Sequence, residues 1–129
     1  MIILDTHIWV WWVGDSLKMD SRRRRLIMRH EADGLGVSII SCWEVAKKVQ
    51  LGKLTMDRPI DEWVKMALEY PGIRLLPLSP QIVLDACELP GEFHKDPADQ
   101  IIVATARTLN AALVSMDEKI LAYPHVKKA

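Results

Sequence analysis

Short apolar runs alternate along the chain with longer stretches in which apolar residues recur at helical spacing. The first four residues are all apolar, and short segments rich in apolar residues follow at residues 35–40, 73–78 and 112–115. An apolar run without polar alternation is typical of a strand that is covered on both faces, as in a parallel sheet. The pattern therefore predicts four short strands.

The segments between these strands predict helices. In residues 60–70, for example, apolar side chains recur at Ile60, Val64, Ala67 and Leu68, on one helical face. The predicted helices span residues 7–13, 20–32, 41–51, 60–70, 80–87 and 97–109, and a short helix follows Asp117. This alternation of strand and helix predicts an α/β domain with helices on both faces of a mainly parallel central sheet.

Length and composition narrow the classes of protein to which the chain can belong. Its 129 residues are 50% apolar and 26% charged, which predicts a single domain over residues 1–129 and excludes a disordered or fibrous chain. Seventeen basic residues balance seventeen acidic ones, so any nucleic acid would have to bind at a local basic patch. No run approaches the ~20 apolar residues of a membrane helix. We expect a cytoplasmic protein without a membrane contact, with Cys42 and Cys87 as buried free thiols.

Four carboxylates stand where a parallel sheet would bring them to one edge. Asp5 follows the first strand, Glu44 lies in the first turn of the helix after the second strand, and Asp117 follows the fourth strand. Asp99 lies in the first turn of the predicted helix at residues 97–109. Ligands of open α/β sheets bind outside the carboxyl ends of the strands. We therefore expect these four side chains to face one site, provided that this last helix packs there.

Each of these acidic positions also has a purely structural interpretation as a helix cap. Ser41 and Glu44 have the spacing of a capping box, in which the glutamate accepts a hydrogen bond from the backbone N–H of the cap residue. Asp96 precedes a proline at the first helical position, which is typical of an N-cap. Asp5 and Asp117 could cap the helices that follow them. Only convergence on one site would favour a catalytic function.

Convergence of four ionised carboxylates has a large energetic cost. Two carboxylates ~5 Å apart repel by about 3 kcal/mol at an effective dielectric constant near 20, and four of them form six pairs. The gross repulsion, about 15–20 kcal/mol as an upper bound, rivals the whole stability of a domain, which is about 5–15 kcal/mol. A divalent cation would offset this repulsion, and an all-carboxylate site suits Mg²⁺ or Mn²⁺ better than zinc. Such an ion can activate water for attack on a phosphodiester.

Four short motifs surround the acidic residues, in order over nearly the full length of the chain. They are Asp5-Thr6-His7 followed by Trp11-Trp12; Ser41-x-Trp43-Glu44 with Lys48 and Leu51-Gly52-Lys53-Leu54; His94-x-Asp96-Pro97-x-Asp99 followed by Ile101-Ile102-Val103-Ala104-Thr105-Ala106; and Leu113-Val114-Ser115-x-Asp117. Together these motifs resemble those of PIN-domain ribonucleases, specifically the VapC-type toxins of bacterial and archaeal toxin–antitoxin pairs.

The resemblance implies a PIN-like fold and a Mg²⁺-dependent endoribonuclease that hydrolyses RNA phosphodiester bonds by metal-activated water. It also implies a cognate antitoxin protein as the inhibitor, and a homodimer. The residues implied as metal-binding and catalytic are Asp5, Glu44, Asp99 and Asp117, with Thr6 and Ser115 as hydroxyl partners of the site. The alternative is a PIN-fold binding or regulatory module with little or no nuclease activity.

The sequence leaves the functions of two residues in the implied site undecided. Asp96 is either a helix cap or a further ligand, and we favour the cap. Gln100 stands where relatives often carry arginine after the third acid, which puts in doubt a basic residue beside the phosphate.

The strongest basic patch follows the first predicted helix and includes Arg22, Arg23, Arg24 and Arg25. Successive helical residues lie ~100° apart, so these four side chains cannot share one helix face. They are either a solvated surface, or contacts for RNA phosphates or for an acidic partner.

Aromatic residues and histidines near the acids have two interpretations each. Trp9, Trp11 and Trp12 could stack on unpaired bases, but the apolar segment around them favours packing in a core or an interface. His94 could assist proton transfer, although a structural or exposed histidine is the commoner case. His7 has no metal-ligand spacing to another histidine.

Overall fold

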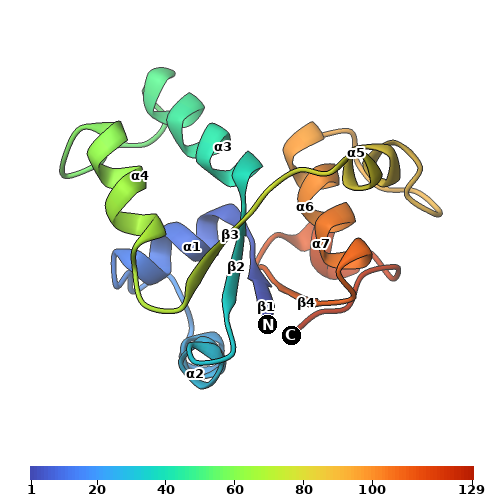
Figure 1. Ribbon diagram of the computed structural model, residues 1–129, viewed down its shortest axis with the longest axis horizontal. Helices are drawn as coiled ribbons and strands as arrows, with labels where there is room; N and C mark the ends of the chain where they lie inside the picture. Colours follow the sequence, from blue (N-terminus) through green and yellow to red (C-terminus); the bar gives the residue numbers. More distant parts are fainter.

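The first strand lies inside a four-stranded sheet in the computed structural model, which describes residues 1–129 (Figure 1). The strands are β1 (Ile2–Leu4), β2 (Leu35–Ser38), β3 (Ile73–Leu76) and β4 (Ala112–Val114), in the spatial order β3-β2-β1-β4. All neighbouring strands are parallel, and Ile3 is paired with Gly36 on one side and with Leu113 on the other. The prediction of a mainly parallel sheet is confirmed.

Seven helices connect and cover the strands. They are α1 (Thr6–Val13), α2 (Ser21–His30), α3 (Ile39–Gln50), α4 (Ile60–Leu68), α5 (Pro80–Cys87), α6 (Pro97–Thr108) and α7 (Glu118–Ala122). Figure 1 shows α1, α3 and α4 on one side of the sheet and α5, α6 and α7 on the other. None of these helices has the length and hydropathy needed to cross a bilayer.

A hydrophobic core lies on each face of the central strand β1, and a third, smaller one lies between α5 and α6. Successive strand residues point to opposite faces of a sheet, so Ile2 and Leu4 pack in one core and Ile3 in the other. The first core also holds Trp9 and Trp12, which are 0% and 8% exposed, and this confirms that these two tryptophans pack inside. Both faces of the sheet are therefore covered, as the continuous apolar strands predicted.

The boundary between β2 and α3 differs from the predicted one. Ser38 is the N-cap of α3, and its hydroxyl accepts a hydrogen bond from the N–H of Ile40 at 3.2 Å. The helix therefore begins at Ile39, and Ser41 lies inside its first turn and is fully buried. The two isoleucines continue the apolar run of the strand, which is why the sequence pattern placed the helix start too late.

The third strand is also shorter than predicted, because it ends at Leu76. Pro77 follows it and has no backbone N–H to donate to a neighbouring strand. The two cysteines are free thiols, but only Cys42 is partly buried. Cys87 is exposed at the end of α5, so the prediction of a buried thiol is wrong there.

The strand order places a topological switch point at the carboxyl end of β1. The chain proceeds from β1 to β2 and β3 on one side of the sheet, then returns to place β4 on the other side of β1. Open α/β sheets bind ligands at the position where the chain stops adding strands on one side of a strand and returns to add one on the other side. The segments that follow β1, β2 and β4 all reach this edge.

Candidate metal centre

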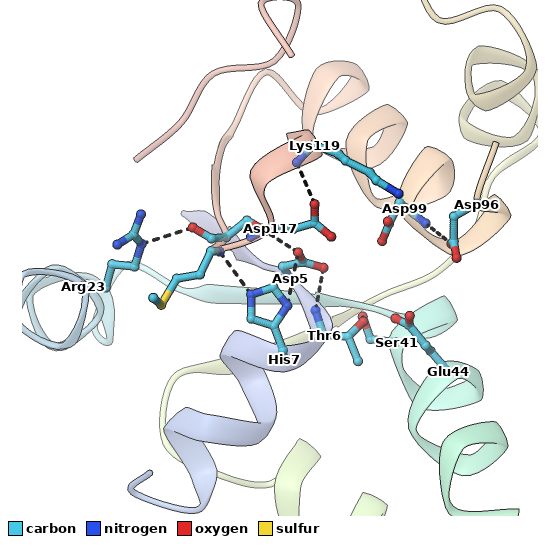
Figure 2. Close-up of polar contacts among 12 residues, drawn as sticks. Asp5, Thr6, His7, Arg23, Ser41, Glu44, Asp96, Asp99, Asp117 and Lys119 are labelled. Atoms are coloured by element: carbon cyan, nitrogen blue, oxygen red, sulfur yellow. Dashed lines mark hydrogen bonds and ion pairs between the residues drawn. The ribbon is translucent and has the colours of Figure 1, made fainter. Parts of the chain in front are cut away.

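Asp5 is the most buried carboxylate at this edge, with a residue exposure of 2% (Figure 2). It caps α1, and its Oδ1 accepts a hydrogen bond from the backbone N–H of Thr6 at 2.8 Å. Its Oδ2 accepts a hydrogen bond from the hydroxyl of Ser115 at 2.7 Å. Two donors stabilise the buried charge, and each carboxylate oxygen keeps a second lone pair for a ligand. The predicted cap at Asp5 is confirmed, and it does not exclude a binding function.

Asp117 is connected to Asp5 through Ser115. The Ser115 hydroxyl donates to Asp5 and accepts a hydrogen bond from the backbone N–H of Asp117 at 2.9 Å. Asp117 also caps α7, since its Oδ1 accepts from the N–H of Lys119 at 2.8 Å. The pairing of β4 with β1 thus brings Asp5 into contact with Ser115, which lies 110 positions further along the sequence.

Glu44 lies on α3 with one carboxylate oxygen that has no partner. Because Ser38 caps this helix, Glu44 is too far along it to form the predicted capping box, and that prediction is wrong. Its Oε2 lies 3.6 Å from Nζ of Lys48, one turn later, whereas Oε1 is buried without a hydrogen bond. An orphaned buried carboxylate oxygen is costly, and it indicates a missing ligand such as a cation.

The first turns of α1 and α3 are joined by a buried hydrogen bond. Thr6 Oγ1 donates to Ser41 Oγ at 2.8 Å, and both residues are at most 4% exposed. This bond connects the helix that Asp5 caps with the helix that carries Glu44. Thr6 and Ser115 therefore both lie within the acidic site, Thr6 through its backbone N–H and Ser115 through its hydroxyl.

Asp96 and Asp99 occupy the first turn of α6. Asp96 is the N-cap, and its Oδ1 accepts a hydrogen bond from the N–H of Asp99 at 3.1 Å. The Asp99 Oδ2 lies 2.9 Å from Nε2 of His94, in an ion-pair contact that is not aligned as a hydrogen bond. His94 therefore contacts one of the four acids directly, a contact that the sequence alone did not predict.

The charges of the other acidic side chains at this edge act on Asp99. Burial, followed by repulsion from the charges of four other carboxylates, raises the pKa of Asp99 from 3.8 to about 7. These carboxylates are Asp5, Asp96, Asp117 and Glu44. The carboxylates that precede α1, α6 and α7, together with the one on α3, thus act on Asp99 at the same edge of the sheet.

The donor set suits Mg²⁺ or Mn²⁺ in its chemistry, because every member is a carboxylate oxygen. Figure 2 shows the four acids from four different elements around one region. In the present side-chain positions, no three Asp, Glu, His or Cys side chains lie close enough to bind a single ion. Asp99 lies instead beside His94, and Glu44 beside Lys48. A cation would therefore compete with these two basic side chains for the carboxylates.

His7 is a site residue that the sequence alone did not identify. Its Nε2 accepts a hydrogen bond from the backbone N–H of Met116 at 3.0 Å, so this nitrogen carries no proton. The other ring nitrogen, Nδ1, lies 3.5 Å from Oδ2 of Asp5. His7 thus spans from Asp5 to the segment that carries Asp117 (Figure 2). Its position directly after Asp5-Thr6 was the available signal, but the partner lies 109 residues away.

The four arginines of α2 do not form one surface. Arg23 donates through Nε to the carbonyl oxygen of Ser115 at 3.1 Å, beside the acidic site. Arg24 forms an ion pair with Asp15 at 2.5 Å. Arg22 and Arg25 are exposed. The structure therefore gives two arginines structural contacts and leaves Arg22 and Arg25 as the members available to an RNA phosphate or an acidic partner.

A comparison with family models identifies the class to which this fold and site belong. The model described as the PIN domain matches residues 2–126. The chain therefore belongs to the PIN domain family. Ribonuclease VapC22 of Mycobacterium tuberculosis is 28% identical over 124 residues, which are 96% of this chain and 92% of that protein.

Solved structures share this fold over nearly the full length of the chain. VapBC2 from Rickettsia felis, bound to a DNA fragment from its promoter, matches with a TM-score of 0.72 at 20% identity, covering 100% of this chain and 98% of that one. A toxin–antitoxin complex from Klebsiella pneumoniae matches with a TM-score of 0.66 at 18% identity, covering 98% and 95%. The similarity to VapC-type PIN domains that the four motifs indicated is confirmed.

Proposed function

We propose that this chain is a Mg²⁺- or Mn²⁺-dependent endoribonuclease and the toxin of a toxin–antitoxin pair. The observation that carries the proposal is the gathering of carboxylates from four elements around Asp99, at the carboxyl ends of the strands. The unpartnered Oε1 of Glu44 at the same place supports a bound cation. The relative from Mycobacterium tuberculosis is named a ribonuclease, which supports RNA as the substrate.

In this proposal the residues of the chain hold the ion and orient it toward a phosphodiester. Asp5 is the fixed member, because Thr6 and Ser115 both donate to it. Glu44 would bind the ion in place of its present contact with Lys48, and Asp99 in place of its contact with His94. When bound, Mg²⁺ lowers the pKa of water and stabilises negative charge that develops on the phosphate. It also offsets the repulsion between these carboxylates and an anionic substrate.

The partner in this proposal is a cognate antitoxin protein. One structure that shares the fold is described as a toxin–antitoxin complex, and another contains VapBC2. A homodimer and a cytoplasmic location belong to the same proposal, and they rest on the family resemblance alone. A neighbouring open reading frame is therefore expected to encode a small DNA-binding antitoxin.

One observation favours the alternative of a binding or regulatory module with little nuclease activity. The acidic side chains are not assembled as a set of three ligands. The orphaned oxygen of Glu44 argues against this alternative, because a degenerate site would have no need to keep a buried unpaired carboxylate.

An RNA-cleavage assay separates these two functions. With single-stranded and structured RNA, the wild-type protein is expected to cleave in Mg²⁺ and to stop when EDTA is added. Asp5→Asn and Asp99→Asn should each lower the rate by about 100-fold or more, because each removes a charged ligand of the ion. Asp96→Asn is the matched control, since an asparagine can still cap α6. Full activity in the Asp5 and Asp99 variants would refute the proposal.

A further inference from the structure

A cavity of about 230 Å³ opens beside the acidic site, between α1, α3 and the segment after α3. Its apolar wall is formed by the indole of Trp11 with aliphatic side chains from α1, α3 and the segment that follows α3. Its polar lining comes from Thr6, His7, Lys48 and Lys53. Neither the fold nor the binding of a metal ion accounts for this combination of an aromatic wall and two ammonium groups.

The cavity adjoins the metal-binding carboxylates through its own lining. Nζ of Lys48 lies 3.6 Å from Oε2 of Glu44, and Nδ1 of His7 lies 3.5 Å from Oδ2 of Asp5. The backbone N–H of Thr6 donates to the same aspartate. A group that occupies the cavity would therefore be a direct neighbour of a phosphate at the acidic site.

The chemistry of the lining is complementary to one nucleotide unit. An indole offers a flat face on which any unpaired base can stack, and ammonium groups attract the phosphates on either side of that base. The cations matter here because the residue next to Asp99 is the neutral Gln100, whose side chain donates to the carbonyl oxygen of His94. Lys48 and Lys53 are the basic side chains of the cavity beside this acidic site.

We propose that this cavity is a subsite for one unpaired nucleobase of the RNA substrate, next to the phosphodiester that is cleaved. The base would stack on Trp11, with a flanking phosphate near Lys48 and Lys53. The inference rests on the proposed ribonuclease function, and it adds that the enzyme reads a single-stranded rather than a paired substrate at this position.

The first test measures nucleotide binding without cleavage. The ¹⁵N-labelled chain is titrated in EDTA with each of the four nucleoside 5′-monophosphates and with ribose 5-phosphate, which has the phosphate but no base. The indole N–H signal of Trp11, assigned by its loss in Trp11→Phe, is expected to shift saturably with nucleotides only. The signal of Trp43, which is 56% exposed and outside the cavity, should stay in place. An unmoved Trp11 signal, or an equal shift with ribose 5-phosphate, would overturn the proposal.

The second test measures KM and kcat on an RNA that the wild-type protein cleaves. Loss of a stacked base partner in Trp11→Ala should raise KM by about 10- to 100-fold, whereas Trp11→Phe should retain most of the affinity. Lys53→Ala should raise KM and reduce its dependence on salt. Lys47→Ala is the control, because Lys47 bonds to Gln50 away from the cavity. Thermal unfolding shows whether each variant is folded, and the nucleotide titration is made on the wild-type chain, with Trp11→Phe used only to assign the signal. Equal KM values in Trp11→Phe, Trp11→Ala and Lys47→Ala would contradict the subsite.

These outcomes separate the subsite from the proposed function. If the wild type cleaves RNA but its Trp11 signal does not shift with nucleotides, the subsite is wrong and the ribonuclease function stands. No cleavage with a nucleotide-dependent shift rejects the ribonuclease and keeps a nucleotide site. A Trp11 signal that responds to a co-purified protein partner but to no nucleotide would make the cavity a protein-docking site, and would overturn the proposal.

Discussion

At the scale of single residues, His7 shows how the acidic site is held in shape. Its two ring nitrogens face two parts of the site that come from opposite ends of the chain, Asp5 and the backbone of Met116. A residue that orients a metal ligand without binding the metal commonly changes metal affinity by about 10- to 100-fold when it is replaced. His7 is therefore expected to be a positioning residue.

Replacement of His7 separates positioning from simple packing. His7→Leu should raise the Mg²⁺ concentration needed for half-maximal cleavage by about 10-fold or more. His7→Gln should restore part of this loss, because a glutamine side chain can still accept the hydrogen bond from Met116. The measurement is cleavage rate against Mg²⁺ concentration. Equal Mg²⁺ dependence in the wild type and in His7→Leu would show that the histidine has a packing function only.

The raised pKa of Asp99 predicts how stability depends on pH in the absence of metal. The folded chain holds a proton on Asp99 up to a pKa of about 7, whereas the unfolded chain releases it near the ordinary pKa of 3.8. Between these values the folded state binds more protons, so the free energy of unfolding should fall as pH rises from about 4 to about 7 and then level off. Urea unfolding in EDTA measures this, and Asp99→Asn should show a shallower decline. An identical decline in the variant would show that Asp99 is not the group whose protonation causes it.

At the scale of helices and strands, the site depends on how the first turns of α1, α3 and α7 are joined by hydrogen bonds at one edge of the sheet. The order of all four strands and seven helices along the chain could be predicted from the apolar pattern and from Gly and Pro positions. The start of α3 could not, because Ile39 and Ile40 fit a strand and a helix equally well. The choice is made by the Ser38 cap and by the buried bond between Thr6 and Ser41, which is a tertiary contact.

The Thr6–Ser41 hydrogen bond is expected to couple α1 and α3 energetically. Thr6→Val should lower the free energy of unfolding by about 1–3 kcal/mol, because it leaves the buried Ser41 hydroxyl with no donor. Ser41→Ala alone should lower the free energy of unfolding by a similar amount, because it leaves the Thr6 hydroxyl with no acceptor. The double variant should lower it by less than the sum of the two single changes. A double-mutant cycle by urea unfolding gives the coupling energy. Strict additivity would mean that the bond does not contribute to the joining of the helices.

The arginines of α2 offer a matched pair at this same scale. Arg23→Ala removes the donor to the carbonyl oxygen of Ser115 and should destabilise the fold by about 1 kcal/mol. Arg22→Ala removes an exposed side chain and should leave stability within about 0.5 kcal/mol. If α2 contacts RNA, Arg22→Ala should instead weaken RNA binding and reduce its salt dependence. Thermal unfolding and RNA-binding titrations of both variants check this, and the opposite ranking in stability would contradict it.

At the scale of the whole molecule, the parallel sheet explains which site residues could be found from sequence. Asp5 and Asp117 follow strands, so their meeting at one edge depended only on the sheet being parallel. Asp99 needed α6 to pack over that edge, which no local pattern shows. The contacts of His94 and His7 and the cavity beside Trp11 depend on the tertiary fold, and for that reason no motif spacing predicted them.

Metal binding by the isolated chain tests the central claim most directly. Isothermal titration calorimetry with Mn²⁺ and with Mg²⁺ is expected to show stoichiometric binding by the wild type. Asn or Gln substitutions at Asp5, Glu44, Asp99 and Asp117 should each weaken this binding by about 10-fold or more, and Asp96→Asn should bind as the wild type does. Binding that survives all four substitutions, or no binding by the wild type, would contradict a metal centre built from these acids.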